Sequence, residues 1–106
     1  MPDIEYEVQL DDSGMEWLRV PITTAGGQVM TFTIQYETIT HGERAQVVRC
    51  DNAHGFAHRD LIDRQGRVTK HPLAGAPAPK TALDTGVRDI RANWRRYRQN
   101  FLRDQR

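Results

Sequence analysis

The sequence has 106 residues, of which 38% are hydrophobic and 27% charged, and its formal net charge is +1. This length suits one domain with one modest core. No apolar run approaches the roughly 20 residues that cross a bilayer, and the acidic start lacks the basic and apolar regions of a signal peptide. We therefore expect one cytoplasmic domain over residues 1–106, with no membrane contact. The single cysteine, Cys50, excludes an intramolecular disulfide and a multi-cysteine zinc site.

The charges are unevenly distributed along the chain. Residues 1–16 contain six Asp or Glu and no Lys or Arg, whereas residues 88–106 contain seven Arg against two Asp. A basic segment of this density is usually a solvated surface, but it also suits a polyanion or an acidic partner.

Residues 1–70 predict an antiparallel sheet. Apolar and polar residues alternate over Ile4–Leu10, the period of a strand with one buried face. Residues 15–20 predict a second strand that Pro21 closes, and residues 23–27 are expected to form a flexible connection. We expect a third alternating strand at Gln28–Ile39.

The turn His41-Gly42 is expected to join this third strand to a fourth at Glu43–Cys50 as a hairpin. The weaker alternation of the fourth strand predicts a position covered on both faces. Residues 56–63 predict a fifth strand, and a turn at 63–66 leads into a short run at 67–70.

The last third of the chain predicts a loop and one helix. Three prolines and several alanines place a loop at residues 71–82, and residues 83–105 are expected to be helical, with Thr81 or Asp84 as the cap. The helix carries an apolar stripe at spacings of three and four: Leu83, Val87, Ile90, Trp94, Tyr97 and Phe101. We therefore predict an α+β fold, an antiparallel β-sheet of five or six strands with one C-terminal amphipathic helix packed on one face.

Four arginines lie along one edge of this helix, since each follows a stripe residue by one position: Arg88, Arg91, Arg95 and Arg98. Guanidinium groups bind phosphate in a bidentate manner, so the row is a candidate to follow an RNA backbone or to meet an acidic protein. The alternative is a solvated flank whose arginine stems cover apolar surface.

Residues 47–60 are the segment most suited to catalysis. RNA cleavage by its own 2′-hydroxyl needs a general base, a general acid and a cation for the phosphorane. The base and acid would be His54 and His58, and the cation Arg49 or Arg59, with Asp51 or Asp60 orienting an imidazole. In an extended chain the two histidines would lie about 13 Å apart, so this hypothesis requires a bend at Gly55.

Two other interpretations of this segment remain open. The spacing of His54 and His58 is that of a zinc pair, but such a pair needs a helix, which Asn52 and Gly55 disfavour. We expect no metal and no other cofactor. In the second interpretation the segment is a polar turn in which Asp51 and Asn52 bind the backbone. His41 and His71 have no assigned role.

The run at residues 49–55, Arg-Cys-Asp-Asn-Ala-His-Gly, followed by His58, resembles a segment of the TumE-like toxins of prokaryotic toxin-antitoxin modules. It also resembles small prokaryotic proteins of unknown function that have an Asp-Asn-Ala-His-Gly core and end in a helix like residues 93–97. The first likeness covers about 20 residues, and the second about residues 43–102. The toxin resemblance implies RNA cleavage, silencing by a co-encoded antitoxin, and a site at Arg49, Asp51, His54 and His58.

The leading functional hypothesis from the sequence is therefore a small metal-independent ribonuclease of toxin-antitoxin type. The alternative is a non-catalytic binding module whose basic helix engages RNA or an acidic protein. The partners to consider are RNA, a cognate antitoxin and a second copy of the chain in a homodimer.

Overall fold

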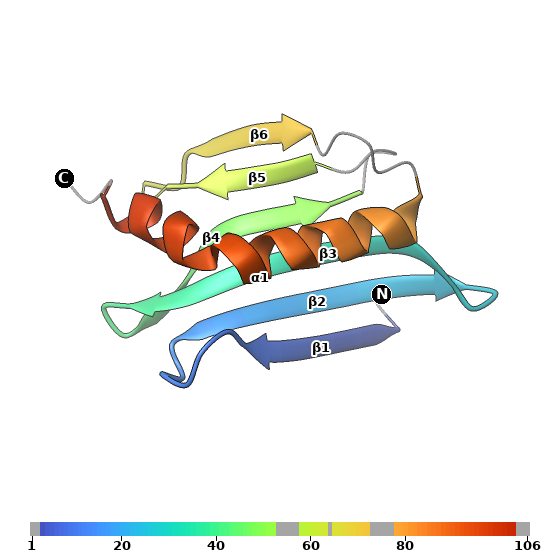
Figure 1. Cartoon of the computed structure of the whole chain (residues 1–106), viewed down its shortest axis with the longest axis horizontal. Coiled ribbons are helices and arrows are strands. Elements are labelled where there is room, and N and C mark those ends of the chain that lie inside the picture. The colour runs from blue at the N-terminus through green and yellow to red at the C-terminus, as the bar shows by residue number, and fades with distance from the viewer. Residues whose placement is uncertain (1–2, 53–57, 64, 73–77, 104–106) are drawn as a thin grey trace.

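The computed structural model describes residues 3–52, 58–63, 65–72 and 78–103. In this part of the chain six strands form one antiparallel sheet, and helix α1 (Pro79–Arg103) lies across one face of it (Figure 1). The strands follow one another across the sheet in chain order: β1 (Ile4–Gln9), β2 (Glu16–Ala25), β3 (Gln28–Thr40), β4 (Glu43–Asp51), β5 (His58–Ile62) and β6 (Val68–Pro72). The predicted α+β fold is confirmed.

Strand β2 does not end at Pro21, which corrects the prediction from the sequence. Pro21 stays in the strand and pairs with Glu5 of β1. Because proline has no N–H to donate, the pairing with β3 is interrupted after Arg19 and resumes at Ile22. The connection expected at residues 23–27 is mostly strand. The chain turns only at Gly26 and Gly27, whose φ angles of 59° and 79° suit a two-residue hairpin turn.

The second tight hairpin, between β3 and β4, turns as expected at His41 and Gly42. Both residues have positive φ, 53° and 77°. Histidine is one of the residues that tolerate this conformation best, so His41 has a structural role in the turn.

The weak alternation of β4 has a different cause from the one predicted. Tyr36 pairs with Val48 and Glu37 with Gln46, so Val47 is an extra residue in a β-bulge. Both Val47 and Val48 are consequently buried. The strand is central in the sheet, but in the described part of the chain a helix covers only one of its faces.

The helix begins at Pro79, four residues before the predicted start at Leu83, and β6 extends through His71 to Pro72. Proline is favoured at the first position of a helix because the N–H that it lacks would have no partner there. The first helical hydrogen bond runs from the Ala82 N–H to the Ala78 carbonyl, so neither Thr81 nor Asp84 caps the helix. Pro72 is tolerated because β6 is an edge strand of the described sheet.

The core lies between α1 and strands β2, β3 and β4. The predicted apolar stripe is buried, except that Val87 is half-buried. Trp94 meets Tyr36 of β3 edge to face, with ring centroids 6.0 Å apart. Gly86, which the predicted stripe did not include, lies close to the sheet, and a Cβ there would be 2.6 Å from Ile34 Cδ1. Within the described residues no helix is long and apolar enough to cross a membrane.

Cys50 is fully buried, and burial raises the pKa of its thiol from 9.0 to about 12. The unfolded chain therefore loses this proton at a lower pH than the folded protein does, so rising pH favours unfolding. We expect Cys50 to contribute a loss of stability of up to about 1.4 kcal/mol per pH unit above pH 9. Urea unfolding of the wild type and of Cys50→Ala from about pH 8 to 11 tests this. The variant should show a shallower alkaline slope, and equal slopes would contradict the expectation.

Candidate functional site

The sheet has a helix side, on which α1 packs, and an open side. On β4, Cys50 lies against Gly86 of the helix, so its neighbours Arg49 and Asp51 lie on the open side. On β5, Arg59 binds residues of α1, so Asp60 lies on the open side.

A polar patch of four residues therefore spans β4, β5 and β6 on the open side: Arg49, Asp51, Asp60 and Lys70. Arg49 Nε lies 3.3 Å from Asp51 Oδ2, and Lys70 Nζ lies 3.3 Å from Asp60 Oδ1. Asp60 pairs across the strands with both Arg49 and Lys70. Both carboxylates are buried, whereas the Arg49 side chain is 43% exposed and remains accessible to an anion.

The two proposed catalytic histidines are only partly placed. His54 and the side chain of His58 lie outside the part of the chain that the structure describes. The backbone of His58 is directly opposite Asp51 in the β4–β5 pairing. Asn52 hydrogen-bonds the backbone of β3 and not that of its own turn, because its side-chain amide accepts from the Phe32 N–H at 2.9 Å and donates to the Met30 carbonyl at 3.1 Å.

Arg59, the alternative catalytic cation, belongs to a different cluster on the helix side. Its Nη1 donates to Asp89 at 3.1 Å and to the Tyr97 hydroxyl at 2.9 Å. Tyr97 in turn donates to Asp89 at 2.6 Å, and Asn93 donates to the other oxygen of Asp89 at 3.0 Å. Burial and the hydrogen bond to Asp89 raise the pKa of Tyr97 to about 12. Arg59 thus joins β5 to α1 and does not face the polar patch.

No group of three or more His, Cys, Asp or Glu side chains in the described residues is placed to hold an ion, and the side chains of the His54–His58 pair of the metal interpretation lie outside them.

The four arginines of the predicted row differ in the contacts that they make. Arg98 Nε lies 3.3 Å from Oε2 of Glu16, a β2 residue whose side chain is 4% exposed. The other oxygen of Glu16 accepts from the Tyr36 hydroxyl at 2.5 Å. Burial and this hydrogen bond raise the pKa of Tyr36 far above its ordinary value. Arg98 therefore compensates a buried carboxylate, which makes it a structural residue.

Arg95, Arg88 and Arg91 have different surroundings. The Arg95 guanidinium lies 4.5 Å from the centroid of the Trp94 ring, a cation–π contact. Arg88 and Arg91 are exposed and form no ion pair with any residue that the structure describes. These two arginines are therefore accessible to a ligand.

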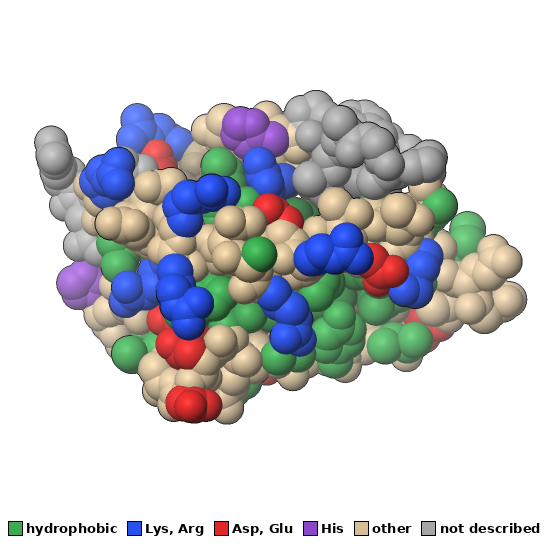
Figure 2. All heavy atoms as spheres, viewed as in Figure 1, with side chains coloured by type: hydrophobic (Ala, Val, Ile, Leu, Met, Phe, Trp, Pro, Cys, Tyr) green, Lys and Arg blue, Asp and Glu red, His purple; other side chains and the backbone are tan. Residues whose placement is uncertain are grey.

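Arg88 and Arg91 lie over a groove of about 610 Å³ between α1 and β1, which we call the α1–β1 groove. Its other lining residues are Tyr6, Leu83, Asp84, Val87 and Ala92. Tyr6 is 38% exposed, and Ile4, at the neighbouring helix-side position of β1, is 48% exposed. Figure 2 shows apolar surface in this region, beneath the basic side chains of the helix. The groove combines an apolar floor with a cationic rim.

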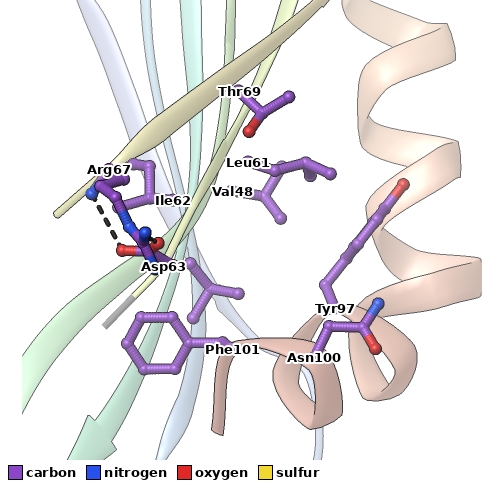
Figure 3. Close-up of a pocket in the computed structure, with 10 residues that line it drawn as sticks. Val48, Leu61, Ile62, Asp63, Arg67, Thr69, Tyr97, Asn100 and Phe101 are labelled. Carbon is purple, nitrogen blue, oxygen red and sulfur yellow. Dashed lines mark hydrogen bonds and ion pairs between the residues drawn. The ribbon is translucent and has the colours of Figure 1, made fainter. Parts of the chain in front are cut away.

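A smaller hollow of about 210 Å³ lies on the other flank of the helix, between α1 and strands β5 and β6 (Figure 3). Its charged lining residues, Asp63 and Arg67, pair with each other at 2.6 Å. Tyr97, which also lines it, donates its hydroxyl proton to Asp89. The hollow therefore presents no uncompensated charge to a ligand.

Sequence reasoning missed the α1–β1 groove and the Arg59–Asp89–Tyr97 cluster. The cluster has a signal in the sequence, since Asp89, Asn93 and Tyr97 are spaced by four and share one helix face. The groove has no such signal, because alternation identifies the apolar side of β1 but not how much of that side one helix covers.

The described residues form an α+β domain with one helix on one side of an antiparallel meander. The sequence matches a family described as "Domain of unknown function (DUF7718)" over residues 1–106. The chain therefore belongs to the DUF7718 family. Comparisons with curated proteins and with solved structures found no match.

Proposed function

We propose that this chain is a non-catalytic binding module and that its α1–β1 groove holds an acidic, partly apolar segment of a partner protein. The observation that carries the proposal is the pair Arg88 and Arg91, exposed over the floor that Tyr6, Leu83 and Val87 provide. Contiguous exposed apolar surface with a polar rim is typical of interaction sites. A cationic rim selects an acidic partner.

A protein partner explains the groove better than RNA does. A phosphate backbone needs a row of cations, but Arg98 is paired with Glu16 and Arg95 lies on the Trp94 ring. Arg88 and Arg91 lie over the groove, and the apolar floor beside them offers nothing to phosphate groups. An amphipathic protein segment uses both features at once.

Site-specific photo-crosslinking in the native host tests the proposal. A photo-reactive residue in place of Ala92 lies in the groove, and one in place of Gln99 is an exposed control on the same helix. We expect a protease-sensitive, nuclease-resistant adduct at position 92 alone. The double variant Arg88→Glu, Arg91→Glu should abolish it, because the rim charge is reversed.

The control is the double variant Arg96→Glu, Arg103→Glu, which makes the same change in net charge at exposed helix positions outside the groove. It should leave the adduct intact. A nuclease-sensitive adduct at position 92 would favour RNA, and equal adducts at both positions would contradict a specific groove.

A metal-independent ribonuclease of toxin-antitoxin type is the second candidate. It is favoured by the β4–β5 pairing, which sets the His58 backbone opposite Asp51, beside the accessible Arg49. Arg49 would then bind the scissile phosphate, and His54 and His58 would share the proton transfers.

The ribonuclease hypothesis predicts that His54→Ala abolishes both growth inhibition on induced expression and RNA cleavage by the purified protein. Loss of a general acid or base costs roughly 10²- to 10⁴-fold in rate. His41→Asn is the matched control, since asparagine also tolerates the positive φ of that turn. Cleavage should persist in a metal chelator. A wild type that neither inhibits growth nor cleaves RNA would rule this candidate out.

A further inference from the structure

The sheet is wider than one helix can cover. Strands lie about 4.8 Å apart, so the six described strands span roughly 24 Å, whereas a helix with its side chains is about 10 Å across. Helix α1 packs against β3, β4 and β5. The helix side of β1 is left open, and Ile4 and Tyr6 are exposed there.

The open surface beside α1 lies over β1, because the helix-side residues Leu18 and Val20 of β2 are fully buried. Packed helices lie about 8–10 Å apart, roughly the width of two strands, so a second helix beside α1 would lie at this edge of the sheet. A strand fits this place poorly, because its backbone N–H and C=O groups would face apolar side chains without partners. A helix satisfies its own backbone hydrogen bonds and can lie on such a floor.

We propose that the occupant of the α1–β1 groove is an amphipathic acidic helix of a partner protein, which completes a two-helix layer on the sheet. This inference rests on the proposed binding function. Arg88 and Arg91 lie one turn apart, so carboxylates three or four residues apart on the partner helix would face them. A second copy of α1 does not suit the groove, because its own arginines would meet Arg88 and Arg91 at like charge.

Selection from a displayed library of random peptides of about 16 residues, roughly four turns of helix, tests the inference. Peptides are kept if they bind the wild type but not Tyr6→Asp, which places a charge on the groove floor. Val68→Asp is the matched control, because Val68 is also an exposed apolar residue of an edge strand and lies outside the groove. Arg88→Glu, Arg91→Glu, which leaves β1 unchanged, takes no part in the selection and is used afterwards to measure the affinity of the selected peptides.

We expect groove-dependent peptides with apolar residues every three or four positions and with Asp or Glu on one flank. Their affinity for the arginine double variant should be about tenfold or more lower than for the wild type, because the charges on one side of the interface are reversed. Groove-dependent peptides with period-two alternation would overturn the helix and leave the binding function standing. Recovery of no groove-dependent peptide would overturn both proposals.

Discussion

Replacing Trp94 with alanine is expected to lower the free energy of unfolding by about 3–5 kcal/mol. Trp94 is buried between α1 and β3 and meets Tyr36 edge to face, so the substitution leaves a cavity and removes an aromatic pair. A small domain typically has only about 5–15 kcal/mol of stability in total. Urea denaturation followed by circular dichroism gives the value directly.

Gln99→Ala, at an exposed position of the same helix, is the control and should change the stability by under about 0.5 kcal/mol. A Trp94→Ala protein as stable as this control would mean that α1 does not pack on the sheet through its aromatic stripe.

Replacing Gly86 with valine is expected to lower the stability by about 1–3 kcal/mol, although valine is a better helix former than glycine. A Cβ at this position would lie 2.6 Å from Ile34 Cδ1 and 3.6 Å from Cys50 Cβ. The helix reaches the sheet here only because residue 86 has no side chain. Denaturation of the single variant measures this cost.

The double variant Gly86→Val, Ile34→Val identifies the contact responsible. Ile34→Val removes the Cδ1 atom that the new side chain meets, so the two changes should be less than additive by at least about 0.5 kcal/mol. Ala92→Val, at an exposed position of α1, should by contrast add to Ile34→Val without coupling. Strict additivity of Gly86→Val and Ile34→Val would contradict the close approach.

The periodic elements of this fold could be predicted because each has an apolar and a polar face, although the apolar face of β1 is largely exposed. The strands containing Tyr6 and Tyr36 and the stripe through Ile90 and Trp94 repeat at the spacings of strand and helix. Local exceptions could not be predicted in the same way. The sequence predicts that the strand ends at Pro21, but β2 continues past this residue because it stays paired with β1. The bulge at Val47 places consecutive apolar residues in the core, so the sequence pattern is the same as that of a strand buried on both faces.

The charge pattern predicted less about the candidate site than the apolar periodicity predicted about the fold. Spacing placed Arg88 and Arg98 on one helix edge, but their roles depend on what lies below them. Arg98 forms an ion pair with the buried Glu16 of β2, whereas Arg88 lines the α1–β1 groove together with Tyr6. Likewise Arg49 and Arg59 are both cations of one segment, and the strand alternation sends them to opposite sides of the sheet.

Methyl-selective NMR of the protein, titrated with the partner segment crosslinked at position 92, tests the groove most directly. The methyl signals of Leu83 and Val87 should shift and gain nuclear Overhauser contacts to apolar side chains of the segment. The methyl signals of Val68, exposed on β6 outside the groove, should stay unchanged. Shifts at Val68 with none at Leu83 and Val87 would contradict binding in the α1–β1 groove.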